Sequence, residues 1–299
     1  MKKLLTLSDN DLPQIWRIAD TQSGKSQKLT LQLTVAKAGG GVVAALGGAL
    51  TFGDVGFLIG SWMILIGFAA ALISEIISWA VKPEKTWYEG RAVAESVKTL
   101  SWRYAIGADP FHTSLSERDA DDLLRERVSS VTDELSDRIT FTGENLIKTP
   151  AMSRLRKQPF AVRRDAYITG RTLEQREWYA RKAKTNQNYS NFWRIVLILT
   201  EITAVILAFS RITGAWSVDY AGLLGAIIAA GTAWVGVKQF TPLASAYSVA
   251  CKELSIQADK LQTVVESDWS YVAADAEEAI SREHTTWLAS RIGLIRPFK

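Results

Sequence analysis

Residues that build metal centres and many active sites are scarce in this 299-residue chain. It has one cysteine, Cys251, and two histidines, His112 and His284. A single cysteine excludes an intramolecular disulfide and a cysteine-based metal cluster. The chain also lacks GxGxxG, HExxH, a complete phosphate-binding loop and a Ser/His/Asp set with supporting motifs. The sequence therefore predicts no catalytic residues, no metal and no cofactor, and the expected protein is not an enzyme.

Charge is missing from long stretches of the chain. Charged residues make up 22% of the sequence and hydrophobic residues 47%, so the apolar residues must be concentrated. Residues 38–53 and 55–74 carry no formal charge, and a second pair of apolar runs lies within 195–237. A membrane-spanning helix needs about 20 apolar residues. We therefore predict an all-α membrane protein whose four transmembrane helices form two helical hairpins in tandem, with long cytosolic helices.

The distribution of charge predicts six segments. They are an N-terminal cytosolic segment (1–30), a first transmembrane hairpin (31–81), a cytosolic helical region (82–166), a basic pre-membrane helix (167–193), a second transmembrane hairpin (194–240) and C-terminal cytosolic helices (241–299). A short interfacial helix carrying Trp16 is expected in the first segment. Lysines and arginines flank both hairpins, which by the positive-inside rule places both termini in the cytoplasm of a multi-pass inner-membrane protein.

Small residues fall one helical turn apart within the predicted spans. Gly40, Ala44 and Gly48 have this spacing in the first span, and Gly225 and Ala229 have it in the fourth. Small residues at such intervals allow two helix backbones to approach closely in lipid. Two interpretations stay open, which are tight packing within a hairpin and the lining of a narrow pore between subunits.

One carboxylate interrupts the third span. Glu201 follows Ile195 by six residues. A charged side chain at the centre of a span costs about 2.5–3.5 kcal/mol on insertion scales, so it should face protein or water. It could line a pore, contact an ion or act as a protonation switch, or it could lie near the inner interface and bond to a neighbouring helix.

The most regular apolar stripe lies after the second hairpin. Its members recur at intervals of four and three residues: Tyr247, Cys251, Leu254, Ala258, Leu261 and Val265. This is the spacing of a coiled-coil seam. The stripe covers fewer than three heptads, so it predicts either the self-associating seam of a homo-oligomer, with Tyr247, Leu254, Leu261 and Val265 as contacts, or one face of a helical bundle.

The two halves of the chain share one plan. Each half has a helix before the membrane, two spans with a short turn, and a long amphipathic helix afterwards, which is typical of an internal repeat. Glu95 and Glu253 lie at matching distances from their hairpins, with an offset of about 158 residues, although the apolar seams favour an offset one helical turn smaller. An even number of spans in each repeat predicts two copies of the same orientation.

Basic residues gather before the second hairpin. Residues 148–194 contain 12 Lys and Arg against 3 Asp and Glu, whereas the predicted helix at 116–138 is acidic. Docking of the acidic helix onto the basic region is the first interpretation, and attraction to anionic lipid is the second. Nucleic acid is not an expected partner, because no nucleic-acid-binding fold motif accompanies the basic residues.

A set of aromatic and charged residues flanks the hairpins: Trp87, Arg91, Glu95, Trp102, Tyr167, Arg171, Gln175, Trp178 and Tyr179. Together with the hairpins they resemble the bacterial SLATT family, the SMODS- and SLOG-associating two-transmembrane effector domains, in two fused copies. Glu283 and Trp287 resemble the C-terminal signature of that family.

The resemblance implies a membrane effector of a bacterial conflict or antiviral system. Such a protein would oligomerise and form a pore or ion channel, or disrupt the membrane, once it is activated. The resemblance also implies a cytosolic partner that senses or produces nucleotides, and it implies no catalytic residues. The alternative function is a non-conducting membrane scaffold or adaptor that recruits cytosolic partners through its helical seams.

Overall fold

The computed structural model describes residues 6–50, 53–133, 147–214 and 218–280. Throughout these ranges the regular structure is helical and no strand is formed, which confirms the all-α prediction. The described residues divide into two compact units. The core unit contains residues 6–25, 85–133, 147–183 and 245–280, and the membrane unit contains residues 26–50, 53–84, 184–214 and 218–244.

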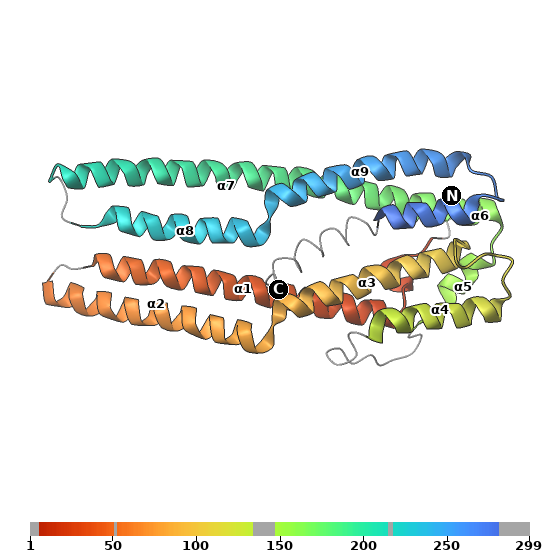
Figure 1. Cartoon of the computed structure of the whole chain (residues 1–299), viewed down its shortest axis with the longest axis horizontal. Coiled ribbons are helices and arrows are strands. Elements are labelled where there is room, and N and C mark those ends of the chain that lie inside the picture. The colour runs from red at the N-terminus through yellow and green to blue at the C-terminus, as the bar shows by residue number, and fades with distance from the viewer. Residues whose placement is uncertain (1–5, 51–52, 134–146, 215–217, 281–299) are drawn as a thin grey trace, which may run out of the picture. The chain divides into compact units, whose positions relative to one another are not determined.

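Long helices make up most of both units (Figure 1). After a short 3₁₀ helix, η1 (Asp9–Asp11), they are α1 (Gln14–Ala49), α2 (Gly53–Val81), α3 (Pro83–Ile106), α4 (Glu117–Thr132), α5 (Pro150–Arg156), α6 (Phe160–Tyr167), the π-helical turn η3 (Ile168–Leu173), α7 (Glu174–Ile212), α8 (Tyr220–Lys238) and α9 (Phe240–Thr263). Residues 269–280 form a further helix.

Four helical segments are long and apolar enough to cross a membrane: Gln14–Ala49, Asp54–Val81, Phe160–Ile212 and Tyr220–Thr263. In the membrane unit α1 and α2 run antiparallel as one hairpin, and α7 and α8 form a second hairpin (Figure 1). Large apolar side chains on these helices are open to their surroundings, among them Phe57, Ile202 and Phe209. Exposed apolar surface of this extent is covered by lipid, so the prediction of four spans in two hairpins is confirmed.

The N-terminal prediction of a short separate helix around Trp16 is wrong. Trp16 lies in α1, which continues without a break to Ala49. No proline interrupts this stretch, and its polar part consists largely of residues that form helices well. Gly24 alone costs about 1 kcal/mol in a helix interior, too little to end it. The basic segment before the second hairpin does run into the third span as predicted, through α7.

A left-handed residue ends the second helix of each hairpin. Lys82 has φ 49° and Gln239 has φ 51°. The N–H of Lys82 donates to the carbonyl of Ser78 at 3.0 Å, and the N–H of Gln239 donates to the carbonyl of Val235 at 2.8 Å. This geometry terminates a helix, and α3 and α9 begin at the next residue. The chain therefore leaves both hairpins through the same turn.

The two turns place the repeat at an offset of 157 residues. The helices α3 and α9 have 24 residues each, and their buried positions correspond at this offset. Val97 matches Leu254, and Tyr104 matches Leu261. This offset lies within one residue of the predicted offset of about 158, and at these two pairs of buried positions the apolar seams need no shift one helical turn smaller.

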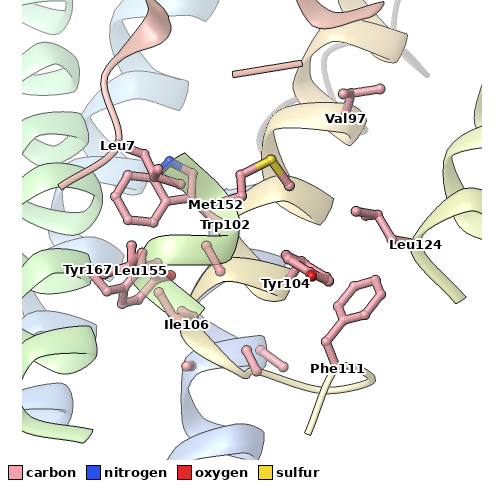
Figure 2. Close-up of a cluster of buried hydrophobic side chains, with 14 of the residues drawn as sticks. Leu7, Val97, Trp102, Tyr104, Ile106, Phe111, Leu124, Met152, Leu155 and Tyr167 are labelled. Atoms are coloured by element: carbon pink, nitrogen blue, oxygen red, sulfur yellow. The ribbon is translucent and has the colours of Figure 1, made fainter. Parts of the chain in front are cut away.

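The core unit is built around aromatic side chains from distant segments (Figure 2). Trp102 and Tyr104 of α3 are buried beside Tyr167 of α6 and Met152 of α5. The indole N–H of Trp269 donates to the carbonyl of Ile106 at 2.9 Å. The helix at 269–280 is therefore part of the same core as α3.

The acidic helix docks onto the basic segment by ion pairs. Lys148 pairs with Asp121 of α4, and Lys157 pairs with Glu117 at 2.9 Å. The hydroxyl of Tyr104 also donates to Asp121 at 2.6 Å. Burial opposes the charge on Asp121, but the hydrogen bonds from Lys148 and Tyr104 outweigh it and lower the pKa of that carboxyl. The docking interpretation of the charge pattern is confirmed by these contacts.

Candidate functional site

An ion pair removed from solvent lies within the core unit. The side chains of Arg171 and Glu277 are 2% and 0% exposed. Arg171 donates through Nε to Oε1 of Glu277 at 2.9 Å and through Nη2 to Oε2 at 3.0 Å. The hydroxyl of Tyr167 donates to the same Oε1 at 3.0 Å. Glu277 therefore accepts three hydrogen bonds, two of them in the bidentate geometry that is strongest for an arginine and a carboxylate.

The π-helical turn η3 positions Arg171. A turn of this kind is an irregularity within a longer helix and is often found at functional sites. Gly170 lies in it, and a Cβ there would collide with the side chain of Thr6. The absence of a side chain at this position thus allows the N-terminal segment to pass directly over the turn.

The electrostatics of the pair follow from burial and proximity. Tyr167 and Arg171, which donate to Glu277, lie outside the membrane-spanning part of the chain, because they precede the apolar part of α7 that begins near Ile195. Burial by itself would lower the pKa of Arg171, but the attraction and hydrogen bonds of Glu277 outweigh it and raise that pKa. Burial and the negative charge of Glu277 raise the pKa of Tyr167. Arginine is thus held charged and tyrosine neutral, and removing one member would leave a buried charge without compensation.

The residues that carry the family resemblance gather in this unit. On α3, Arg91 pairs with Glu95 at 2.9 Å, and Trp87 is buried. Trp102 packs edge-on against Tyr167, with ring centroids 5.9 Å apart. The ion pair counters the effect of burial on Arg91, so the pKa of that guanidinium is raised.

The start of α7 meets α9 through aromatic rings. Trp178 and Tyr179 lie 5.4 and 5.6 Å from the ring of Tyr247. Gln175, one turn earlier on α7, is half-buried. The structure therefore brings the motif residues of both halves into one core.

Glu277 is the residue that sequence reasoning missed. The expected C-terminal signature, Glu283 and Trp287, lies outside the described residues. A usable signal was present, because Glu277 has helical spacing with the buried Ala273 and Ile280. A carboxylate on the apolar face of a helix requires a buried partner, and Arg171 is that partner.

The first hairpin packs backbone against backbone. A Cβ on Gly40 would lie 2.5 Å from the carbonyl oxygen of Gly67, and a Cβ on Gly47 would lie 2.5 Å from that of Gly60. Ala44 is buried between these two crossings. Residues seven apart on α1 thus face residues seven apart on α2, which is the periodicity of coiled-coil packing.

The small residues predicted as pore candidates divide into two groups. Gly40 and Ala44 face α2 within the hairpin, a position that favours the packing interpretation for them. Gly48 has no atom within 4 Å of its Cβ direction, and Gly225 on α8 is open in the same way. Ala229 is exposed. The contact between the helices is made by Gly47 and not by Gly48. A constant step of four residues from Gly40 leads to Gly48, whereas a packing seam alternates steps of four and three and leads to Gly47.

Glu201 lies on an open face of α7. It is exposed, and it makes no ion pair or hydrogen bond with the part of the chain that the structure describes. At 1.5 Å per residue it is about 10 Å along the helix from Arg194 and about 15 Å from Arg211. Ile198 and Ile202 beside it are also exposed. A carboxylate therefore lies well inside an apolar surface with no partner among the described residues.

Most of the predicted association seam is used within the chain. Leu254 is 1% and Leu261 is 0% exposed, and both belong to hydrophobic clusters of the core unit. Tyr247 is partly buried, whereas Val265 lies beyond the end of α9 and is 59% exposed. These positions favour the bundle interpretation. Contact with a second copy through the two leucines would require them to leave their present partners.

Among residues 6–50, 53–133, 147–214 and 218–280, no group of three or more His, Cys, Asp or Glu side chains is arranged to hold a metal ion. The charged residues described above differ in their surroundings: Arg171 and Glu277 form a buried ion pair, and Glu201 is exposed on an apolar helix face. This arrangement suits structural and electrostatic roles.

Comparison with known proteins gives two family matches that together cover most of the chain. The model of SMODS and SLOG-associating 2TM effector domain 3 matches residues 13–164. The model of SMODS and SLOG-associating 2TM effector domain 1 matches residues 167–287. No curated protein and no solved structure matches the chain. The boundary between the two matches falls within the second half of α6, between the two halves of the repeat.

Proposed function

The chain belongs to the SLATT effector family as two fused domains, and from this premise we propose that it is a pore-forming membrane effector of a bacterial conflict system. Copies of the protein assemble in the inner membrane and, once activated, open a passage that depolarises the cell. Both termini and the core unit face the cytoplasm, because basic residues flank the hairpins on that side.

The observation that carries the proposal is the carboxylate of Glu201, which has no ion pair or hydrogen bond with the residues that the structure describes. Facing lipid, it would cost each chain about 2.5–3.5 kcal/mol on insertion scales. Contact with a second copy or with water inside an assembly removes this cost. The exposed Gly225 and Ala229 of α8 offer a surface on which a neighbouring helix can pack closely.

The packing of the first hairpin favours different roles for the two hairpins. The backbones of α1 and α2 are in close contact at Gly40 and Gly47. The charged residues of this hairpin near the inner boundary, Lys37 and Glu75, form an ion pair. The second hairpin has an open charged residue instead. We assign the passage to the second hairpin and a supporting role to the first.

The activating signal enters through the core unit in this proposal. The family description associates these domains with SMODS and SLOG proteins, and a cytosolic partner that produces or senses nucleotides is the proposed source. The core unit contains the aromatic contacts between α9, which follows α8 after the turn at Gln239, and the start of α7, which is itself a helix of the second hairpin. A partner that moves these contacts would act directly on that hairpin.

The test is ion flux through the purified protein in liposomes. We expect the wild type to be oligomeric and to release potassium, and Glu201→Gln to alter the conductance. Glu177→Gln is the matched control, because Glu177 is on the same helix but outside the apolar segment, in an exposed pair with Arg181. A monomeric protein with no flux under any activating condition would overturn the proposal, and a silent Glu201→Gln would favour a scaffold.

A further inference from the structure

A single residue joins the second hairpin to the helix that follows it. Gln239 lies between α8 and α9 with φ 51° and ψ 44°. Its N–H donates to the carbonyl of Val235 at 2.8 Å, and its carbonyl accepts from the N–H of Leu243 at 3.0 Å. The first of these bonds ends α8 and the second begins α9. The two backbone torsions of Gln239 therefore set the direction in which the chain leaves α8.

The left-handed conformation of Gln239 needs support from other residues. A residue with a Cβ avoids this region, because the Cβ comes too close to the following carbonyl oxygen. Such a conformation persists only where the surrounding structure holds it. Contacts of the residues beside the turn must therefore keep Gln239 in this form.

Two pairs of side chains connect the start of α9 to α7. The hydroxyls of Ser190 and Thr241 are hydrogen-bonded at 2.6 Å, and the rings of Tyr189 and Phe240 have centroids 5.4 Å apart. Ser190 is 6% and Phe240 is 4% exposed. All four residues belong to the membrane unit. We call these four residues the clasp, and it connects the two helices that precede and follow α8 in the sequence.

A constraint of the first turn is missing from the second. The left-handed residue of the first turn, Lys82, is followed at once by Pro83. The proline ring fixes its own φ and restricts the residue before it. The residue after Gln239 is Phe240, and the next proline, Pro242, lies inside the first turn of α9. The second turn therefore depends more on side-chain contacts, which can break and form again.

We propose that the clasp is a switch that keeps the second hairpin in its resting form. This inference rests on the proposed function, because it assigns the regulation of the passage that we place in that hairpin. Loss of the Ser190–Thr241 and Tyr189–Phe240 contacts frees Gln239 to leave the left-handed region. The helix α8 then changes its position against α7.

The helix α9 is the element that releases the clasp. It extends from Phe240 to Thr263. Its first two residues belong to the clasp, and further along it carries Leu254 and Leu261, which belong to the hydrophobic clusters of the core unit. Rigid helices carry a displacement from one end to the other. A signal that moves α9 in the core unit therefore acts on the clasp without a further element.

Hydrogen exchange at the turn tests the clasp without any measurement of conduction. Ser190→Ala and Thr241→Val each remove the hydroxyl pair. In lipid nanodiscs the amides of residues 236–244 should then exchange about tenfold faster than in the wild type. Ser210→Ala is the matched control and should exchange like the wild type, because the hydroxyl of Ser210 bonds to the carbonyl of Ile206 within α7. Equal exchange in all three variants would overturn the proposal.

Potassium release from liposomes tests the role of the clasp in regulation. Without any partner protein, Thr241→Val should release potassium about tenfold faster than the wild type, because the resting form has lost a hydrogen bond. Ser210→Ala should release potassium like the wild type. If Thr241→Val exchanges fast at the turn but releases potassium no faster than the wild type, the clasp does not regulate the passage and the inference fails.

A disulfide across the clasp provides the opposite change. Ser190→Cys and Thr241→Cys are combined with Cys251→Ser, which removes the one native cysteine. The native hydroxyl oxygens are 2.6 Å apart, so the two sulfurs are placed to bond. We expect slow exchange at residues 236–244 and no potassium release after oxidation, and recovery of both after reduction. Release that is the same in the oxidised and reduced protein would contradict the switch.

These measurements separate the inference from the proposed function. Absence of potassium release from the wild type and from every variant would contradict the proposed function. Hydrogen exchange would still decide whether the clasp holds the turn at Gln239, and it decides alone if the disulfide does not form.

Discussion

Arg171 and Glu277 are 106 residues apart in the chain and form a bidentate ion pair in the interior of the core unit. The pair ties the π-helical turn before α7 to the helix at 269–280. One residue comes from the start of the second repeat and the other from its last described helix. The contact therefore joins the first and last described parts of the second repeat. Its loss should lower the stability of the whole core unit.

Replacing Glu277 by glutamine should destabilise the protein by about 3–5 kcal/mol, because a buried guanidinium is left without its counter-charge. Thermal unfolding in detergent, followed by the fluorescence of the buried Trp102 and Trp269, measures the effect. Glu177→Gln, in an exposed pair with Arg181, should change stability by less than about 1 kcal/mol. Similar losses in the two variants would contradict a special role for the buried pair.

Adjacent glycines in α1 should respond in opposite directions. Gly47→Ala forces a methyl group into the carbonyl of Gly60 and should destabilise the first hairpin by roughly 1–3 kcal/mol. Gly48→Ala meets open space and should be neutral or stabilise the helix by up to about 1 kcal/mol. Denaturant titration of the two variants in detergent micelles measures both. Equal effects would show that the hairpin does not pack through Gly47.

Stability should fall in acid because of Asp121. Lys148 and Tyr104 hold the pKa of its carboxyl below the ordinary value in the folded protein, so the unfolded chain binds the proton more readily. Its contribution to stability is complete above the unfolded pKa of about 3.9 and is lost as pH falls through the lower folded pKa.

The melting temperatures of wild type and Asp121→Asn from pH 7 to pH 3 test this effect. The wild type should be the more stable at pH 7, and the difference should shrink below about pH 4. The exposed neighbour Asp122 supplies the control, since Asp122→Asn should change stability little over the same range. A difference between wild type and Asp121→Asn that does not depend on pH would exclude the titration of Asp121 as its cause.

The stripe on α9 should act on folding before association. Leu254→Ala and Leu261→Ala each leave a cavity in the core unit and should cost about 2–5 kcal/mol. Val265→Ala, at an exposed site, should have little effect on stability. Unfolding and size-exclusion chromatography with light scattering separate the two roles. A variant at Leu254 that keeps its stability but loses its oligomeric state would show that the stripe is an interface between copies.

Part of the site was predictable because its signals are local. The resemblance to the family relied on residues such as Trp87, Arg91 and Trp178, which occur at short spacings within one helix. Glu277 was missed because its partner is distant, and nothing in the local sequence identifies Arg171 rather than another of the many arginines. Small-residue spacing indicated helix packing, but it could not distinguish Gly47 from Gly48, since that depends on how each helix is rotated about its axis.

The sequence by itself determined the four spans, the two hairpins and the family of this protein. Span length and charge placement are properties of a single segment in a bilayer, so they can be read without knowledge of other segments. Only the tertiary structure decided which glycines touch, that Leu254 and Leu261 are buried within the chain, and that Arg171 pairs with Glu277. Those outcomes depend on helix rotation, on the turns at Lys82 and Gln239 and on contacts across more than a hundred residues, which no local pattern specifies.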